Sequence, residues 1–181
     1  MIQTSLLPLI DELLLGVQGD NFWENYLKQL MSQDAVPFSL HLAIFVEPYL
    51  QFVLEGKKTV ESRFSTRRFA PYNKVQKGDV VLLKRSSGPI LGICQISYVW
   101  FYELDPQSWH TIRQEFSQAL CAQDPEFWKA REAASYATLM RVNNVKAIEP
   151  IKFTKRDRRG WVVLHKSSGQ LELNLKEVWN Q

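Results

Sequence analysis

The sequence predicts an α+β fold, in which a small mixed β-barrel carries an N-terminal helical extension and a set of inserted helices. Three observations lead to this prediction. Apolar residues recur at helical spacing over residues 5–33, five or six strand-like segments follow from residue 39, and two Asp-Pro pairs open a helical stretch near residues 105–141. We therefore divide the chain into an extension, residues 1–37, and a barrel domain with a helical insertion, residues 38–181.

The N-terminal extension is predicted to form two helices separated near "GVQGD". Asn21 and Glu24 have the spacing of a capping box at the start of the second helix. Its apolar side chains follow i, i+4 spacing and define one face: Phe22, Trp23, Tyr26, Leu27, Leu30 and Met31. This face either packs on the barrel, which is the commoner use of an amphipathic helix, or binds a protein partner.

The first elements of the barrel are a strand and a short helix. The segment "SLHLAIFVE" has the continuous apolar character of a buried strand, and Pro48 then opens a short helix that ends at Gly56. Alternation in "TVESRF" predicts the next strand. The segments "GDVVLLKR" and "ILGICQISYVWFYEL", joined by "SSGP", predict a hairpin.

The inserted helices begin at two Asp-Pro pairs. The segments "DPQSWHTIRQEFSQAL" and "DPEFWKAREAASYATLM" each place Asp at the N-cap and Pro at the first helical position. We expect helical structure to continue to about residue 141. Strand character resumes in "VNNVKAIEPIKF" and, after the basic turn "TKRDRRG", in "WVVLH", and these segments are predicted to complete the barrel.

Composition excludes several classes of protein. A chain of 181 residues with 45% apolar and 23% charged residues is typical of a globular protein with a buried core. Cys94 and Cys121 belong to no CxxC or Cys/His cluster, so we expect buried free thiols, no metal site and no cofactor. Asp11 and Glu12 interrupt the N-terminal leucines, which argues against a secretion signal. With no apolar run of the roughly 20 residues that span a bilayer, we expect a cytoplasmic protein without a membrane partner.

Basic residues are concentrated in two parts of the chain. Residues 56–85 contain nine basic and two acidic residues, and residues 152–181 contain seven and three, whereas residues 1–55 contain one and seven. If folding brings the two basic segments together, they form a cationic surface that attracts polyanions. Lysine and arginine side chains that only solvate loops would give the same counts.

The segment "GKKTVESRF", residues 56–64, places cations and a carboxylate at the turn from helix to strand. Strand alternation puts Glu61 and Arg63 on one face, where the carboxylate can hold the planar guanidinium in position. The turn breaks the alternation, so the spacing leaves open whether Lys57 or Lys58 joins them. An ordered guanidinium and a free ammonium beside a cleft suit recognition of a phosphate or of a base edge.

Four of these residues also carry a resemblance to a known family. Gly56, Lys58, Glu61 and Arg63 fit the pattern G-x-K-x-x-E-x-R, and the chain thereby resembles the ASCH domain, a member of the PUA-like β-barrel superfamily. The flanking strand, Pro-opened helix and "KGDVVLL" and "ILGICQISYV" strands fit as well. The resemblance covers residues 39–104 and, as closing strands, 142–166. It implies a PUA-like barrel whose cleft, with the motif at its base, binds RNA or nucleotides.

The resemblance also implies an enzymatic alternative, a small hydrolase. One similar group, modified-nucleoside amidohydrolases, uses a motif lysine, a hydroxyl residue three positions later and a downstream glutamate. Lys58 matches the lysine, but Glu61 stands where the hydroxyl residue is expected. Other relatives are metal-dependent ribonucleases, which need grouped carboxylates, and Glu61 has no identifiable second ligand. In either enzyme Lys58 and Glu61 would serve in proton transfer and charge stabilisation.

The loop "STRRFAPYNK" after the motif mixes cations with aromatic residues, as single-stranded nucleic-acid sites do. Alternatively, the loop is solvated and binds no ligand, and its aromatic residues only anchor it to the barrel. We predict an RNA- or nucleotide-binding protein over a hydrolase and over a scaffold in which the charged turn is only structural. The predicted ligand-binding residues are Lys57, Lys58, Glu61, Arg63, Arg67, Arg68 and Tyr72.

Overall fold

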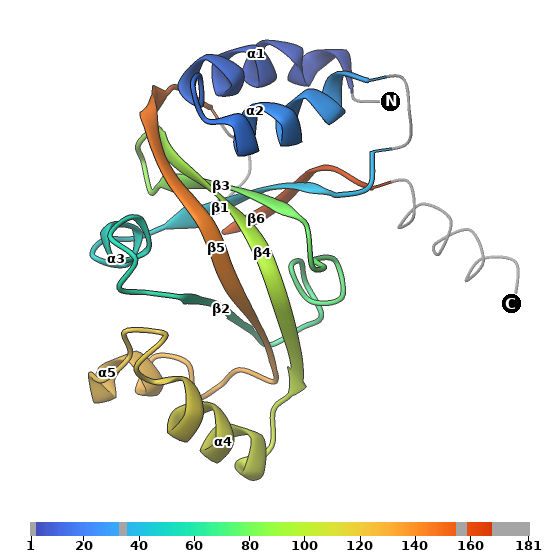
Figure 1. Ribbon diagram of the computed structural model, residues 1–181. Helices are drawn as coiled ribbons and strands as arrows, with labels where there is room; N and C mark the ends of the chain where they lie inside the picture. Colours follow the sequence, from blue (N-terminus) through green and yellow to red (C-terminus); the bar gives the residue numbers. More distant parts are fainter. Residues whose placement is uncertain (1–2, 33–35, 155–158, 168–181) are drawn as a thin grey trace, which may run out of the picture.

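The computed structural model describes residues 3–32, 36–154 and 159–167. Six strands form a single curled sheet, and helices lie at both of its ends and beside it (Figure 1). The predicted α+β class with a barrel-like sheet is therefore confirmed. The last part of the predicted barrel domain, residues 168–181, lies outside the described residues.

The sheet has the strand order β2-β5-β4-β3-β1-β6. Its strands are β1 Leu40–Phe45, β2 Val60–Ser65, β3 Val80–Arg85, β4 Ile90–Glu103, β5 Tyr136–Ile151 and β6 Trp161–His165. Strands β1 and β3 pair in parallel, and all other neighbours are antiparallel. The pairing of the two longest strands, β4 and β5, contains three register shifts, which bend a ladder and increase its twist. The sheet can therefore curl.

The N-terminal helices α1 Leu7–Gly16 and α2 Asn21–Lys28, with the short 3-10 turns Thr4–Leu6 and Gln29–Met31, lie at one end of the sheet (Figure 1). Their buried side chains, among them Leu13, Trp23 and Leu27, share one apolar cluster with sheet residues such as Leu42 and Leu82. Most of the predicted apolar face of α2 thus packs on the barrel, but Phe22 and Met31, which we assigned to it, are exposed.

The start of α2 differs from the prediction by one residue. The N-cap is Asp20, whose carboxylate accepts a hydrogen bond from the backbone N–H of Trp23. Glu24 accepts from the backbone N–H of Gly19 at 2.6 Å. Asn21 is the first helical residue because the aspartate before it is the better-placed acceptor, so the predicted capping box was wrong.

The inserted helices α4 Pro106–Phe116 and α5 Pro125–Lys129 lie at the opposite end of the sheet from α1 and α2 (Figure 1). The two predicted caps are present, since Asp105 accepts from the backbone N–H of Ser108 and Asp124 from that of Glu126. The predicted helix to residue 141 is wrong, because β5 begins at Tyr136. Residues 136–141 pair with β2 on one side and β4 on the other, and this pairing overrides their helix propensity.

A buried polar cluster holds Trp161 in place at the start of β6. The indole N–H of Trp161 donates to Nδ1 of His41 at 3.1 Å, so Nε2 of His41 carries the proton and donates to Asp79 at 2.9 Å. His41 and Asp79 are fully buried. Because buried polar groups need partners, this chain of contacts fixes the orientation of the Trp161 ring.

The two cysteines are free, with Cys94 fully buried and Cys121 half-buried. Burial raises the pKa of the Cys94 thiol. Among the described residues, no helix combines the length and the apolar character needed to cross a bilayer.

Candidate functional site

A pocket of about 350 Å³ lies at the predicted motif, and we call it the motif pocket. It is formed by the end of β1, the start of helix α3 Tyr49–Leu54, strand β2, and α5 with the turn after it. Its lining residues are Ile44, Phe45, Val46, Tyr49, Lys58, Glu61, Ser62, Arg63, Phe64, Phe127, Ala130 and Arg131. Three of the predicted residues, Lys58, Glu61 and Arg63, are thus brought together.

The turn after α3 decides which lysine faces the pocket. Gly56 ends the helix in the left-handed region, with φ of 71°, and the backbone N–H of Lys58 returns to the carbonyl of Phe52 at 2.9 Å. Lys58 consequently points inward. Lys57 is exposed and pairs with Glu55 at 2.6 Å, so it does not line the pocket.

Lys58 is buried at the base of the pocket, with only 2% of its surface exposed. Its Nζ donates to the backbone carbonyls of Val60 at 2.8 Å and Leu120 at 3.1 Å, and the carboxylate of Glu61 lies 3.4 Å away. Burial lowers the pKa of Lys58, and Glu61 opposes that shift. The prediction of a free ammonium was wrong, because the protein itself supplies acceptors to this group.

Glu61 lies between two cations. Its two carboxylate oxygens approach Lys58 Nζ at 3.4 Å and Arg63 Nε at 2.9 Å, and its side chain is 8% exposed. The expected contact between Glu61 and Arg63 is present. A nearly buried carboxylate needs such compensation, so Glu61 couples the buried lysine to the arginine.

Arg63 bridges strands that are not neighbours in the sheet. Its Nη1 donates to the carbonyls of Ile44 on β1 at 3.0 Å and of Gly160, just before β6, at 3.1 Å. Its guanidinium also lies over the rings of Phe45 and Trp161, at 5.1 and 5.4 Å from their centroids. A side chain at Gly160 would crowd it, because a Cβ there would lie 3.2 Å from Nη1.

The donors of Arg63 are not all used by the protein. Although Nε is close to Glu61, its N–H is not aimed at the carboxylate, so this contact is an ion pair without a hydrogen bond. Nη2 has no hydrogen-bond partner among the described residues. The side chain is 21% exposed. Arg63 is therefore held in place while part of its guanidinium remains accessible to a ligand.

Arg131, which the sequence analysis missed, is the fourth charged residue of the pocket. Its guanidinium carbon lies 3.7 Å from the ring centroid of Phe127, and its Nη1 donates to the Phe127 carbonyl. The i, i+4 spacing of Phe127 and Arg131 is the sequence signal that could have indicated this pair. Nothing in the sequence indicated that α5 would fold back onto the motif.

Aromatic rings form one side of the motif pocket. Tyr49 and Phe64 both contact Phe127 edge-to-face, with centroid distances of 5.8 and 6.3 Å. We call Tyr49, Phe64 and Phe127 the aromatic wall. The guanidinium of Arg131 stacks on Phe127, so it extends the aromatic wall by a flat, positively charged surface.

The remaining predicted residues lie outside the motif pocket. Arg68 forms an exposed ion pair with Glu103 and lies over the ring of Tyr136. Tyr72 is buried against Phe101 and Tyr136, and Arg67 is exposed. The loop after the motif thus packs against the end of β4 and the start of β5. The role of its residues in ligand binding stays a prediction.

Comparisons with known proteins agree with this geometry. The model of the ASCH domain family matches residues 44–153, which is more than half of the chain and includes the whole motif. Among curated proteins, none is significantly similar to the sequence.

Within the described residues, no group of three or more His, Cys, Asp or Glu side chains is placed to hold a metal ion.

Solved structures of one ASCH protein share the fold. The ASCH protein from Zymomonas mobilis has a TM-score of 0.57 at 12% identity, covering 76% of this chain and 94% of its own. A variant of the same protein has a TM-score of 0.58 at 14% identity, covering 76% and 96%. At such identities the likeness concerns the fold alone. With the match over residues 44–153, the chain belongs to the ASCH domain family.

Proposed function

We propose that this protein binds RNA or a nucleotide in the motif pocket. The observation that carries the proposal is the convergence of three cations, Lys58, Arg63 and Arg131, with one carboxylate and an aromatic wall around one opening. The charged groups sum to a net positive site, which favours an anionic ligand. RNA binding is the function to which the ASCH family is generally linked.

The charged residues have different roles in this proposal. Arg63 and Arg131 keep guanidinium groups at the pocket surface, where their planar forks suit a phosphate or a base edge. Lys58 and Glu61 are buried and act as positioning residues. The ammonium compensates the carboxylate, and the carboxylate in turn holds the arginine.

The size and the lining of the pocket favour a nucleotide unit. A volume of about 350 Å³ lies near the lower end of the range of about 300–1,000 Å³ that is usual for ligand pockets. Tyr49 and Phe64 line the pocket, and one face of Phe64 is stacked on Trp109. Stacking of a base on an aromatic ring contributes about 1–3 kcal/mol. We therefore expect one base on the aromatic wall and its phosphate near the two arginines.

The test is the affinity for a fluorescently labelled single-stranded RNA, measured by anisotropy at several salt concentrations. Arg131→Met removes a guanidinium but keeps an apolar contact with Phe127. Loss of a charge-assisted hydrogen bond, about 1.5–3 kcal/mol, predicts roughly a 10- to 100-fold weaker affinity. The salt slope should fall by about 0.7 for the lost phosphate contact.

The matched control is Lys57→Met, which removes one cation of the turn after α3 that lies outside the pocket. Its affinity should stay within about twofold of the wild type, because an exposed charge contributes little. Wild-type binding that does not depend on salt, or equal losses in the two variants, would contradict the proposed site.

A hydrolase using the same pocket is the second candidate, favoured by a desolvated lysine beside a carboxylate at the pocket base. Because the described contacts of Lys58 Nζ are to acceptors of the protein, we rank it below binding. Acylated nucleosides and RNA, each with and without a divalent cation, form the screen. Turnover that Glu61→Gln abolishes under conditions in which circular dichroism shows the variant to be folded would support the enzyme.

A further inference from the structure

A further pocket lies on the inserted helices, and its volume of about 330 Å³ is close to that of the motif pocket. Helix α4 supplies most of its lining, and the turn after α5 supplies the rest. Figure 1 shows these two helices together at one end of the sheet. We call this space the α4 pocket. Its lining residues are Pro106, Trp109, His110, Arg113 and Glu132.

Two features place the α4 pocket next to the motif pocket. The ring of Trp109 is stacked on that of Phe64, a member of the aromatic wall, with a centroid distance of 5.3 Å and an interplanar angle of 2°. Glu132 directly follows Arg131, which lines the motif pocket. A stacked pair of rings therefore stands between the two pockets, with Phe64 lining one and Trp109 lining the other.

The α4 pocket contains two exposed charges of opposite sign that do not pair with each other, Arg113 and Glu132. The guanidinium of Arg113 lies over the rings of Trp109 and Trp128, at 5.5 and 5.6 Å from their centroids. Within the described part of the chain, neither this guanidinium nor the Glu132 carboxylate forms a hydrogen bond or an ion pair. The pocket thus offers a ligand a group that only donates and a group that only accepts.

A ligand that satisfies both groups needs acceptors on one edge and donors on another, on a flat ring that can contact Trp109. Guanine has this pattern, because O6 and N7 accept from an arginine while N1–H and the 2-amino group donate to a carboxylate. Adenine and cytosine have an amino group without a ring N–H beside it, and uracil has a ring N–H without an amino group. A carboxylate can therefore accept two neighbouring hydrogen bonds only from guanine.

We propose that the α4 pocket recognises a guanine base of the same RNA strand that occupies the motif pocket. This inference rests on the proposed function and adds base specificity to it. Arg113 donates to O6 and N7, Glu132 accepts from N1–H and the 2-amino group, and Trp109 contacts the plane of the base. Because the charges of Arg113 and Glu132 cancel, this pocket specifies a base and does not neutralise a phosphate.

The experiment measures by anisotropy the affinity of the full chain for labelled RNAs of about ten nucleotides. Each RNA is a run of uridines with guanosine, inosine, adenosine, cytidine or uridine at one central position. Inosine lacks the 2-amino group of guanosine, so it removes one contact to Glu132 without changing the protein. The test variant is Glu132→Gln. The control is Glu126→Gln, which neutralises an exposed carboxylate of α5 outside both pockets.

The wild type should bind the guanosine RNA about 5- to 150-fold more tightly than the adenosine, cytidine and uridine RNAs, which is the discrimination of one good bidentate contact. The inosine RNA should lie between them. In Glu132→Gln the difference between guanosine and inosine should shrink to within about twofold, because the acceptor of the 2-amino group is lost. Its affinity for the uridine RNA and its salt slope should keep their wild-type values, since no phosphate contact is removed. Glu126→Gln should keep the full guanosine preference.

Three results would overturn the proposal. Equal wild-type affinities for all the RNAs, or a preference for another base, would exclude guanine recognition, while salt-dependent binding that Arg131→Met weakens would leave the motif pocket standing. A guanosine preference that Glu132→Gln retains would place the recognition elsewhere on the molecule. No binding of any of these RNAs by the wild type would refute the proposed function and this inference with it.

Discussion

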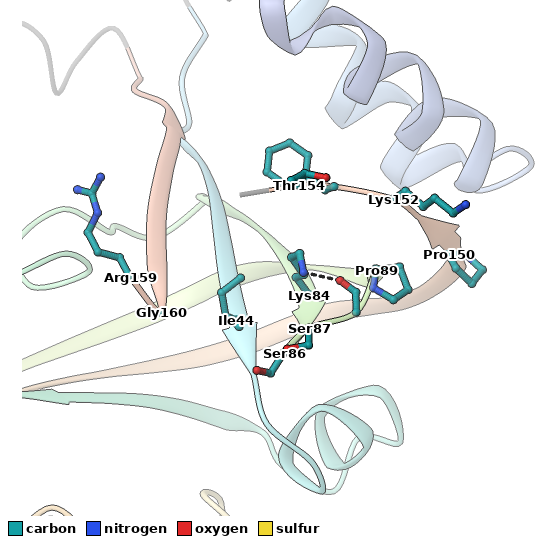
Figure 2. Close-up of a pocket in the computed structure, with 12 residues that line it drawn as sticks. Ile44, Lys84, Ser86, Ser87, Pro89, Pro150, Lys152, Thr154, Arg159 and Gly160 are labelled. Carbon is teal, nitrogen blue, oxygen red and sulfur yellow. Dashed lines mark hydrogen bonds between the residues drawn. The ribbon is translucent and has the colours of Figure 1, made fainter. Parts of the chain in front are cut away.

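The motif pocket and a second pocket at the β3–β4 turn, which we call the hairpin pocket (Figure 2), hold their cations in different ways. In the motif pocket Glu61 lies between Lys58 and Arg63, and aromatic rings surround the charges. In the hairpin pocket the described lining residues include Lys84, Lys152 and Arg159 but no carboxylate. The motif pocket holds its charged groups in a fixed geometry, whereas two of the cations that line the hairpin pocket, Lys152 and Arg159, are exposed.

Cations held in a fixed geometry can orient a ligand, whereas exposed cations mainly attract one. A paired and stacked guanidinium recognises the shape of a ligand, because its donors are held in one direction. Exposed cations attract any polyanion and lose their effect in salt. Substitutions in the motif pocket should accordingly change stability and ligand selectivity, and loss of an arginine that contacts a phosphate should also lower the salt dependence.

Glu61→Gln should have the largest effect. It keeps the shape of the side chain but leaves the buried ammonium of Lys58 without its carboxylate, a change that typically costs about 3–5 kcal/mol. We expect the free energy of unfolding, measured in urea, to fall by about this amount. RNA binding should also be lost, because Arg63 is no longer held in position by the carboxylate.

The double variant Lys58→Met/Glu61→Leu separates folding from binding. Replacing a buried ion pair by apolar side chains is often neutral or stabilising, so its unfolding free energy should lie near the wild-type value. RNA affinity should remain low because Arg63 is no longer held by a carboxylate. A double variant that is stable and binds RNA normally would show that the buried pair does not position the arginine.

Arg63→Lys should have the next largest effect on binding. A lysine keeps the charge, but its donors all sit on one nitrogen, so it lacks the second planar nitrogen that Arg63 can offer to a ligand while Nη1 donates to the carbonyls of Ile44 and Gly160. We expect a monophosphate affinity roughly 10- to 100-fold below the wild-type value in calorimetry, for the loss of about 1.5–3 kcal/mol. An unchanged affinity would mean that only the charge of Arg63 matters.

The two lysines of the motif turn should respond to pH in opposite directions. Burial lowers the pKa of Lys58 below its usual 10.5, so between the lowered value and 10.5 the unfolded chain binds more protons than the folded one. The free energy of unfolding of the wild type minus that of Lys58→Met should therefore rise with pH in this window.

Lys57 supplies the contrasting case. Its hydrogen bond to Glu55 raises its pKa, so its contribution to stability is present below 10.5 and is lost as pH rises through the raised value. The difference between the wild type and Lys57→Met should fall over that range. Urea denaturation of the three proteins at several alkaline pH values checks both slopes, and equal slopes would contradict the burial of Lys58.

Arg68→Met should have the smallest effect. Arg68 lies outside both pockets, and its partner Glu103 is as exposed as Arg68 itself. We expect an RNA affinity within about twofold of the wild-type value and no change in the salt slope, because exposed ion pairs contribute little. A loss comparable to that of Arg131→Met would move the binding surface to the loop after the motif.

Local patterns predicted much of the fold. Proline and aspartate marked the starts of α4 and α5, and alternation marked the strand that carries Glu61 and Arg63. The segment from Tyr136 was assigned to helix because its residues tolerate a helix, and only pairing with both β2 and β4 decides otherwise.

The candidate site could be predicted only where its residues are close in sequence. Glu61 and Arg63 are two positions apart on one strand, so alternation sufficed. The orientation of Lys58 depends on acceptors as distant as the Leu120 carbonyl, and the position of Arg131 depends on how α5 packs against the motif. Neither arrangement leaves a periodic signal in the sequence.

A crystal structure of the protein with a short single-stranded RNA is the most direct test of the proposed binding site. We expect a phosphate oxygen within about 3 Å of a guanidinium nitrogen of Arg63 or Arg131, with the base of that nucleotide against the aromatic wall. An RNA bound elsewhere on the molecule, with the motif pocket left empty, would contradict it.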